Sequence, residues 1–251
     1  MISLAQLEKL SQDFKIDKFT VFREYLQILF LNYLYQEKLS EKICFKGGTC
    51  LHLFYHSPRF SEDLDFSTTL SEEKIKDLVE KTMKKFQIEI PNLKLIFVYR
   101  GKTSLRFKLR YKTDFLKFPQ SIRLDFSLEK TFLKPNLLSL KTKFPISFFP
   151  LVSCQREEEI LAEKIRAFLK RARGRDLFDL WYLLDKGVLI DEKLLKKKLK
   201  MVNLKFNKKL FLEKIKNYPE KKIYLDLAKF LPSFYRKIIP ELKPRLISLI
   251  D

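Results

Sequence analysis

The residues best able to carry chemistry lie in one stretch, residues 45–67, which reads FKGGTCLHLFYHSPRFSEDLDFS. Gly47 and Gly48 follow a short apolar run, and adjacent glycines let the backbone pass close to a ligand because no Cβ stands in the way. Thr49 then leads into a segment with helical character, and the free N–H groups at a helix start favour phosphate. The Gly-Gly turn is therefore a candidate phosphate cradle.

Two aspartates follow this turn. Asp63 and Asp65 flank Leu64, and period-two alternation places both carboxylates on one face of a predicted strand. Carboxylates about 7 Å apart along a strand can bind hard divalent cations that also contact a nucleotide's phosphates. Taken alone, a Gly-Gly pair is often only a turn, and an Asp-x-Asp pair is often a solvated strand face. The two signals together, at this spacing, favour a nucleotide site.

A third aspartate stands on another predicted strand. In residues 121–127, SIRLDFS, apolar and polar side chains alternate, and Asp125 falls on the polar face. If this strand pairs beside the one that carries Asp63 and Asp65, all three carboxylates can share a face. By itself, a single aspartate on a strand carries little functional information.

A lysine in the second half of the chain stands at a position where the pattern predicts an apolar residue. The helix predicted over residues 156–172 carries Lys164 inside its apolar stripe, with Arg171 close above it. A lysine in that position must either extend to solvent or meet a buried anion.

An acidic pair follows in the next predicted helix, after a break at Gly174. Asp176 and Asp179 are three residues apart and project from one side of that helix. Their plainer interpretation is structural, with Asp176 as the helix cap and Asp179 in an ion pair with Arg171 or Arg175.

The sequence motifs of both regions resemble those of one known family. KGGT followed by RFSEDLDFS is similar to the first motif of the polymerase-beta-type nucleotidyltransferases, and it is most similar to the AbiEii/AbiGii-type toxins of bacterial toxin–antitoxin systems. The same family has an E-K-I-x-A setting, matched around Lys164, and an R-D-x-x-D-L setting, matched by Asp176 and Asp179. The resemblance extends over residues 42–184, with the two motif blocks in the same order.

The roles of individual residues are implied by this resemblance. The implied catalytic residues are Asp63, Asp65, Asp125, Lys164, Asp176 and Asp179. The implied nucleotide-binding residues are Gly47, Gly48, Thr49, Arg59, Lys164 and Arg171. The implied metal ligands are Asp63, Asp65 and Asp125, which would hold two Mg²⁺ ions, and Asp125 is alternatively the base on the attacking hydroxyl.

The resemblance also implies a fold and an activity. The fold is α+β, with a mixed-sheet nucleotidyltransferase domain in residues 1–150, an α-helical domain in residues 151–251, and the active site in the cleft between them. The activity is transfer of a nucleoside monophosphate from an NTP to an acceptor hydroxyl, with release of pyrophosphate. The implied acceptor is the 3′ end of tRNA, and the implied partner is an antitoxin from a separate gene.

The charge of the chain points independently to nucleic acid. Lysine and arginine number 51 against 31 aspartates and glutamates, a formal net charge of +20. Phosphate contacts release counterions and dominate non-specific affinity, so a polyanionic partner is favoured. A basic RNA- or DNA-binding module that keeps the fold without catalysis is the alternative function. Transfer onto protein hydroxyls is a third hypothesis.

Other sequence features indicate the cellular compartment. The three cysteines form no metal-ligand spacing and favour reduced thiols, and His52 and His56 lack the acidic context of a metal pair. The first residues lack the pattern of a signal peptide, and no apolar run reaches the roughly 18 residues of a membrane span. We therefore expect a cytoplasmic protein that does not cross a membrane.

The elements that must position these residues follow from periodicity. Helices are predicted over residues 3–15 and 19–36 as supports beneath the first strand, and over 71–86 as a capped amphipathic helix. Residues 93–98 and 104–112 form a predicted hairpin with a strongly basic outer face. That face is either simply solvated or a surface that follows phosphates.

The remainder of the chain is predicted to be a linker and then helices. Residues 133–153 contain three prolines and no sustained period, so they are the predicted linker. Only helical patterns follow, and the last helical segment is predicted over residues 233–250, interrupted by Pro240 and Pro244.

Overall fold

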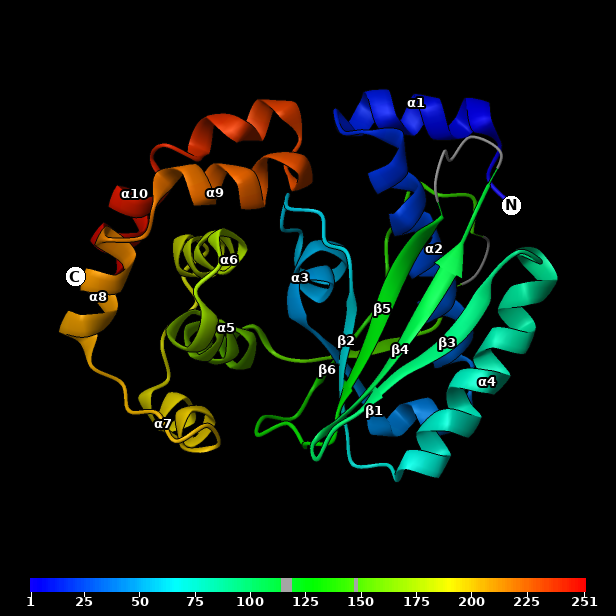
Figure 1. Ribbon diagram of the computed structural model, residues 1–251, viewed down its shortest axis with the longest axis horizontal. Coiled ribbons are helices and arrows are strands. Elements are labelled where there is room, and N and C mark those ends of the chain that lie inside the picture. Colours follow the sequence, from blue (N-terminus) through cyan, green and yellow to red (C-terminus); the bar gives the residue numbers. More distant parts are fainter. Residues whose placement is uncertain (114–118, 147–148) are drawn as a thin grey trace. The chain divides into compact units, whose positions relative to one another are not determined.

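The computed structural model describes residues 1–113, 119–146 and 149–251, and the chain divides into two compact units (Figure 1). Unit 1 comprises Met1–Phe54 and Phe60–Gln155, and unit 2 comprises Tyr55–Arg59 and Arg156–Asp251. Unit 1 holds the sheet, and unit 2 is helical. The predicted α+β fold, with a mixed sheet followed by helices, is confirmed.

Unit 1 is built on a seven-stranded sheet of order β3-β4-β5-β2-β1-β7-β6. The strands are β1 (Ile43–Lys46), β2 (Leu64–Thr68), β3 (Lys94–Arg100), β4 (Ser104–Tyr111), β5 (Gln120–Ser127), β6 (Asn136–Leu138) and β7 (Val152–Cys154). The pairs β2–β5 and β1–β7 are parallel, and the other pairs are antiparallel. The strand with Asp125 therefore lies beside the strand with Asp65.

The two faces of this sheet differ as the alternation predicts. On β4 and β5 the buried side chains are Leu105, Phe107, Leu109, Tyr111, Ile122, Leu124 and Phe126. Phe66 of β2 stacks on Phe126 with ring centroids 4.8 Å apart, which ties the central strands together on this inner face. The outer face carries the polar side chains, including the arginines and Asp125.

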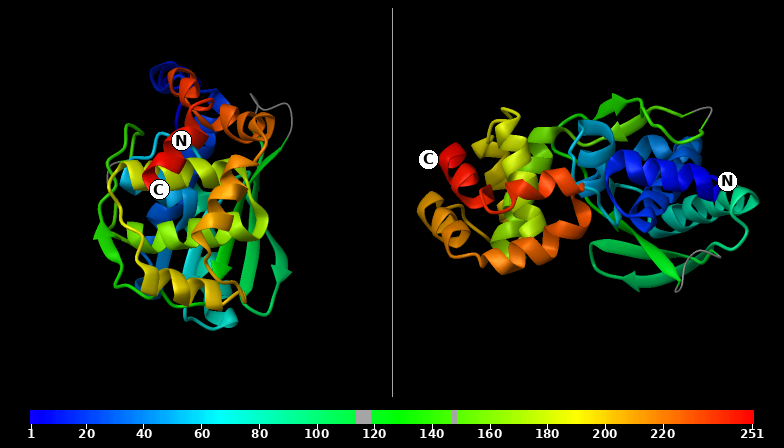
Figure 2. Two further views of the ribbon diagram at one scale, coloured as in Figure 1. Left: turned by 90° about the vertical axis from the view of Figure 1, so that its left-hand side faces the viewer. Right: turned by 90° about the horizontal axis from the view of Figure 1, so that it is seen from above.

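The helices of unit 1 are α1 (Leu4–Phe14), α2 (Lys18–Tyr35), η1 (Lys38–Lys42), α3 (Gly47–Tyr55) and α4 (Glu72–Glu89). Of these, α2, α3 and α4 lie against the inner face of the sheet, and α1 packs on α2 (Figure 2). Phe22 of α2 packs on Tyr111 of β4 at 5.8 Å between ring centroids, and Lys76 of α4 lies 4.8 Å from the centroid of Phe97. These helices bury the inner face of the sheet and not the outer face, which carries Asp125.

The predicted linker is wrong in part. Within residues 133–153, β6 and β7 pair with each other, and β7 joins the sheet beside β1 through the register Phe45 with Cys154. Both strands are only three residues long, too short to show a period between prolines. Residues 147 and 148 of the predicted linker lie outside the described residues.

Unit 2 contains only helices in its described elements. They are α5 (Glu157–Arg171), α6 (Gly174–Asp185), α7 (Glu192–Lys200), α8 (Lys208–Lys216), α9 (Glu220–Leu227), η2 (Ala228–Phe230), η3 (Ser233–Ile238) and α10 (Leu242–Ile250). In the segment predicted over 233–250, η3 ends before Pro240 and α10 begins after it, so the predicted interruption at Pro240 is confirmed, whereas Pro244 lies inside α10. In the described part of the chain, no helix has the length and hydropathy needed to span a membrane.

Candidate active site

Gly47 joins β1 directly to α3 and sets the geometry of the site. Its φ of +81° lies in the region that favours glycine, and a Cβ at this position would stand 3.1 Å from both Cβ and Cγ of Asp65 and closer still to its Oδ2. The backbone of the Gly-Gly turn therefore lies directly against the Asp65 carboxylate. The helix begins at Gly47 itself, earlier than the predicted start at Thr49.

Thr49 links this helix to the other aspartate. Its side chain is buried, and its hydroxyl donates a hydrogen bond to the main-chain carbonyl of Asp63. The family resemblance gives this hydroxyl a role in holding the triphosphate. In the structure its proton is directed at the backbone of Asp63, so Thr49 positions the start of the Asp-x-Asp segment.

The three predicted metal ligands come together at neighbouring strands. Asp65 of β2 is the register partner of Asp125 on the parallel strand β5, and Asp63 immediately precedes β2. Residues in register on adjacent strands present their side chains on the same face. The structure thus brings Asp63, Asp65 and Asp125 to one region of the outer face.

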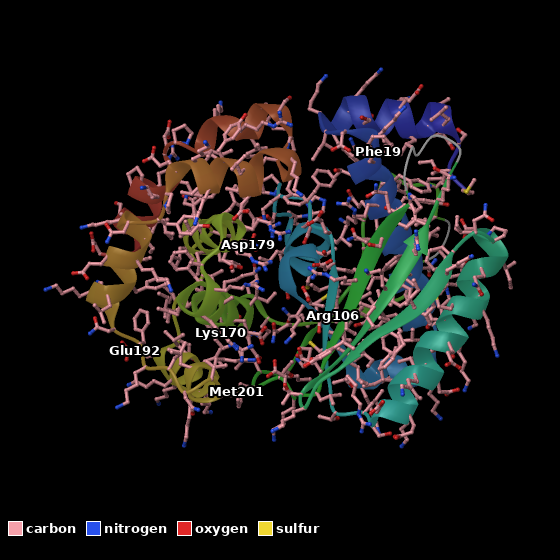
Figure 3. All side chains as sticks on the ribbon, in the orientation of Figure 1. Phe19, Arg106, Lys170, Asp179, Glu192 and Met201 are labelled. Carbon is pink, nitrogen blue, oxygen red and sulfur yellow. The ribbon has the colours of Figure 1, made fainter. Side chains whose placement is uncertain are left out.

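Two arginines form ion pairs with carboxylates of this region. Arg123 of β5 donates from Nε to Oδ1 of Asp63 at 3.0 Å, and its Nη2 also donates to Oδ2. Arg106 of β4 donates to Oδ2 of Asp125 from Nε at 2.9 Å and from Nη2 at 2.5 Å (Figure 3 labels Arg106). Sequence reasoning did not assign either arginine to the site, although strand alternation placed both on the polar face with Asp125.

All three acids act electrostatically on Arg123. The hydrogen bond to Asp63 raises the pKa of the Arg123 guanidinium, burial lowers it, and the charges of Asp63, Asp65 and Asp125 each raise it further. The pKa therefore stands above its ordinary value, chiefly because of the hydrogen bond with Asp63.

The donor set fits a hard divalent cation, which prefers carboxylate oxygens. Within residues 1–113, 119–146 and 149–251, however, no group of three His, Cys, Asp or Glu side chains is arranged to hold a metal ion. Arg123 pairs with both oxygens of Asp63, and Arg106 pairs with Oδ2 of Asp125. A cation bound by Asp63 would compete with Arg123 for these oxygens.

Unit 2 holds a second charged cluster, centred on Asp179 of α6 (labelled in Figure 3). Arg59 donates to its two carboxylate oxygens at 2.7 and 2.8 Å, and Lys164 Nζ of α5 lies 2.6 Å from Oδ2. Asp179 is completely buried, and Arg59 and Lys164 are nearly so. Lys164 therefore meets a buried anion, and the expected pairing of Asp179 with Arg171 or Arg175 is wrong.

The cluster keeps Asp179 ionised. Burial acts to raise the pKa of this carboxyl, but the charges of Arg59 and Lys164 and their hydrogen bonds lower it by more, so the pKa lies below its ordinary value. Asp179 thereby fixes the head groups of Arg59 and Lys164.

Asp176 lies at the edge of the same cluster. It is buried, 3.8 Å from Lys164 Nζ and 3.4 to 3.5 Å from the Arg171 guanidinium nitrogens. Its expected role as the helix cap is wrong, because the residue at the cap position of α6 is Arg173. The first N–H of α6, from Gly174, is instead bound at 2.8 Å by the carboxylate of Asp226, a residue that no local sequence signal connects to this helix.

A hollow of about 920 Å³ lies elsewhere in unit 2. It is lined by α7, the turn that follows it, and Ile190, Lys208 and Ile250. None of the predicted site residues lines it.

Comparisons with known proteins bear on the family and the fold. The family model for the AbiEii toxin, a nucleotidyl transferase of type IV toxin–antitoxin systems, matches residues 29–244. The structure is similar to MenT4, a nucleotidyltransferase toxin from Mycobacterium tuberculosis H37Rv, with a TM-score of 0.66 and 21% identity over 98% of this chain and 90% of that one. It is also similar to JHP933 from Helicobacter pylori, with a TM-score of 0.58 and 21% identity over 94% of this chain and 91% of that one. No curated protein matches the sequence.

The structural matches define a nucleotidyltransferase toxin fold. Because the family model spans most of the chain, the protein belongs to the AbiEii nucleotidyltransferase toxin family of type IV toxin–antitoxin systems. Membership implies an NTP substrate and a cognate antitoxin.

Proposed function

We propose that this toxin transfers a nucleoside monophosphate from an NTP to the 3′-terminal hydroxyl of tRNA. The oxygen of that hydroxyl forms a bond to the α-phosphorus, the bond from the α-phosphorus to the bridging oxygen breaks, and pyrophosphate leaves. The hydroxyl proton passes to a carboxylate or to water. Because NTPs and tRNA are substrates of the cytoplasm, the proposed reaction belongs there.

The observation that carries the proposal is the register of Asp65 with Asp125 beside the Gly47 turn. Two carboxylates from neighbouring strands, a third just before β2, and a helix start beside them combine cation donors with a phosphate site. The net charge of +20 supports a nucleic acid acceptor.

The proposal gives each residue a task. Asp63, Asp65 and Asp125 would hold Mg²⁺, which when bound neutralises charge on the phosphates and on the leaving pyrophosphate. Gly48 and the first turn of α3 offer N–H groups to the phosphates. Asp125 also aligns the acceptor hydroxyl if it is freed from Arg106.

In unit 2, Lys164 is proposed to offset phosphate charge. Its side chain retains 12% of its surface, while Asp179 beneath it has none. Asp179 would act as a positioning residue for Lys164. Arg59, which binds both oxygens of the Asp179 carboxylate, would help to hold that carboxylate in place. Asp176 and Arg171 form the neighbouring pair, with Arg171 half exposed.

The experiment that tests the proposal is label transfer. The protein is incubated with Mg²⁺, total RNA and each of the four NTPs labelled at the α-phosphate. Transfer of label to tRNA-sized RNA by the wild type, its loss in Asp65→Asn, and its retention in the surface control Asp77→Asn are the expected results. Asp77 is a half-exposed residue of α4, paired with Lys81.

Other outcomes would overturn the proposal in different ways. If no NTP labels RNA or protein, the chain is a non-catalytic binding module on this fold. If the label migrates with polypeptide, the acceptor is a protein hydroxyl.

A further inference from the structure

We propose that the outer face of strands β3, β4 and β5 binds the acceptor RNA, with the phosphodiester backbone on its basic residues and a terminal base on Tyr99. This inference rests on the proposed function and gives it a surface. The basic strand face is defined as Lys94, Tyr99, Arg106, Lys108, Arg110 and Arg123.

The register of the strands places like charges directly opposite one another. Lys94 of β3 is the partner of Arg110 of β4, and Lys108 of β4 is the partner of Arg123 of β5. Side chains in such pairs start about 5 Å apart, and like charges there destabilise a sheet. Arg123 and Arg106 are compensated by Asp63 and Asp125, so Lys94, Lys108 and Arg110 are the cations that fit a surface whose anions come from a ligand.

The basic residues run along the strands toward the aspartates. Arg110, Lys108 and Arg106 follow one another on one face of β4, with about 7 Å between successive residues. Arg106 ends the run at Asp125, and the charges of all three aspartates act on Arg123. A backbone that lies on this face would therefore deliver one end to the carboxylates.

Tyr99 stands at the end of the face where the chemistry is proposed. It is half exposed, it is the register partner of Arg106, and the Arg106 guanidinium lies 5.9 Å from its ring centroid. Gly101 leaves room for this ring, since a Cβ there would meet the ring carbon Cε1 at 2.7 Å. An exposed aromatic ring beside arginine is the platform on which unpaired bases stack.

The opposite layer of unit 1 supplies a matched control. Lys74 and Lys84 are exposed on α4, the helix that covers the inner face of the sheet. Arg100, which alternates to that inner side, reaches Glu72 of α4 at 2.7 Å, consistent with this placement. Substituting Lys74 and Lys84 with glutamine removes the same net charge as substituting Lys108 and Arg110.

The test is tRNA binding measured apart from catalysis. All variants are made in the full chain with Asp65→Asn, and fluorescence anisotropy of 5′-labelled bulk tRNA is followed across a salt series. The pair Lys108→Gln and Arg110→Gln is expected to weaken binding about tenfold and to reduce the salt slope by about 0.7 for each lost contact. The pair Lys74→Gln and Lys84→Gln is expected to leave both unchanged.

Tyr99 is tested with two substitutions. Tyr99→Ala is expected to weaken binding about tenfold, and Tyr99→Phe, which keeps the stacking ring, to leave it unchanged. Equal losses from the two charge pairs would mean that net charge alone attracts RNA, and no loss from Lys108 and Arg110 would mean that the face is not contacted. Either result overturns the inference. Failure of the proposed function is distinguished because it appears as absence of label transfer by the wild type.

Discussion

Two clusters in this protein are built from the same chemical groups but differ in burial. The strand cluster of unit 1 comprises Asp63, Asp65 and Asp125 with Arg106 and Arg123. In it, Asp63 and Arg123 are paired at the surface, and the Arg123 side chain is 45% exposed. At the helix cluster of unit 2, Asp179 is completely buried between Arg59 and Lys164. Sequence motifs alone marked the acids of both clusters as one kind of site.

The difference in burial gives the two clusters different roles. A surface ion pair contributes between 0 and about 1 kcal/mol, so its partners can be exchanged for a ligand at little cost. Removal of one member of a buried pair leaves an uncompensated charge in the interior. The strand cluster is therefore suited to binding and release, and the helix cluster to holding Arg59 and Lys164 in place.

The largest expected effect separates activity from stability at the strand cluster. Asp63→Asn should lower nucleotide transfer by about 10³-fold, because it removes a carboxylate from the proposed cation site. The free energy of unfolding should change by no more than about 1 kcal/mol, because the partner of Asp63 is exposed. Label transfer and urea unfolding of the same preparation check the two halves. A large loss of stability together with activity would count against the distinction.

The same change at the helix cluster should act first on stability. Asp179→Asn should destabilise the fold by about 3–5 kcal/mol, since two cations are left without their anion in the interior. Urea unfolding checks this value, and Asp63→Asn serves as the matched control. Similar stability of the two variants would remove the contrast between the clusters.

The pH dependence of stability follows from the lowered pKa of Asp179. A carboxyl whose pKa is lower in the folded state stabilises the fold above its unfolded pKa, about 3.9, and this stabilisation is lost as the pH falls through the folded pKa. The wild type should therefore lose stability below about pH 4 more steeply than Asp179→Asn. Unfolding midpoints measured from pH 6 to pH 2.5 test this, and parallel curves would contradict it.

The smallest effect concerns the link between the Gly-Gly turn and Asp63. Thr49→Val keeps the shape of the side chain but loses the hydrogen bond to the Asp63 carbonyl, and it should lower transfer about tenfold with a small loss of stability. Thr49→Ser should restore most of the activity. Steady-state transfer rates check both variants, and a failure of serine to rescue would show that the methyl group matters instead.

The sheet that holds the strand cluster was largely predictable. Alternation in residues 104–112 and 121–127 depends on neighbours in sequence, and it placed Asp125 and the arginines on the outer face correctly. The strands β6 and β7 were missed because three residues cannot establish a period. In residues 233–250 the interruption at Pro240 was predicted correctly, but Pro244 lies in the first turn of α10 and does not break it.

The helix cluster was predictable only in half. The position of Lys164 in an apolar stripe required either solvent or a buried anion, and the anion proved to be Asp179. Arg59 is separated from Asp179 by 120 residues, and no periodicity connects them. Pairings at such separation depend on the tertiary fold, as do the contacts of Arg123 with Asp63 and of Gly174 with Asp226.

The central proposal is that the aspartates of the strand cluster bind a divalent cation together with the nucleotide. Electron paramagnetic resonance of Mn²⁺ with a non-transferable NTP analogue measures this directly, because bound and free ions give different signals. The wild type should immobilise Mn²⁺ only when the nucleotide is present, and Asp65→Asn should immobilise far less, with Asp77→Asn behaving as the wild type. Equal binding of Mn²⁺ by the wild type and Asp65→Asn would contradict the claim.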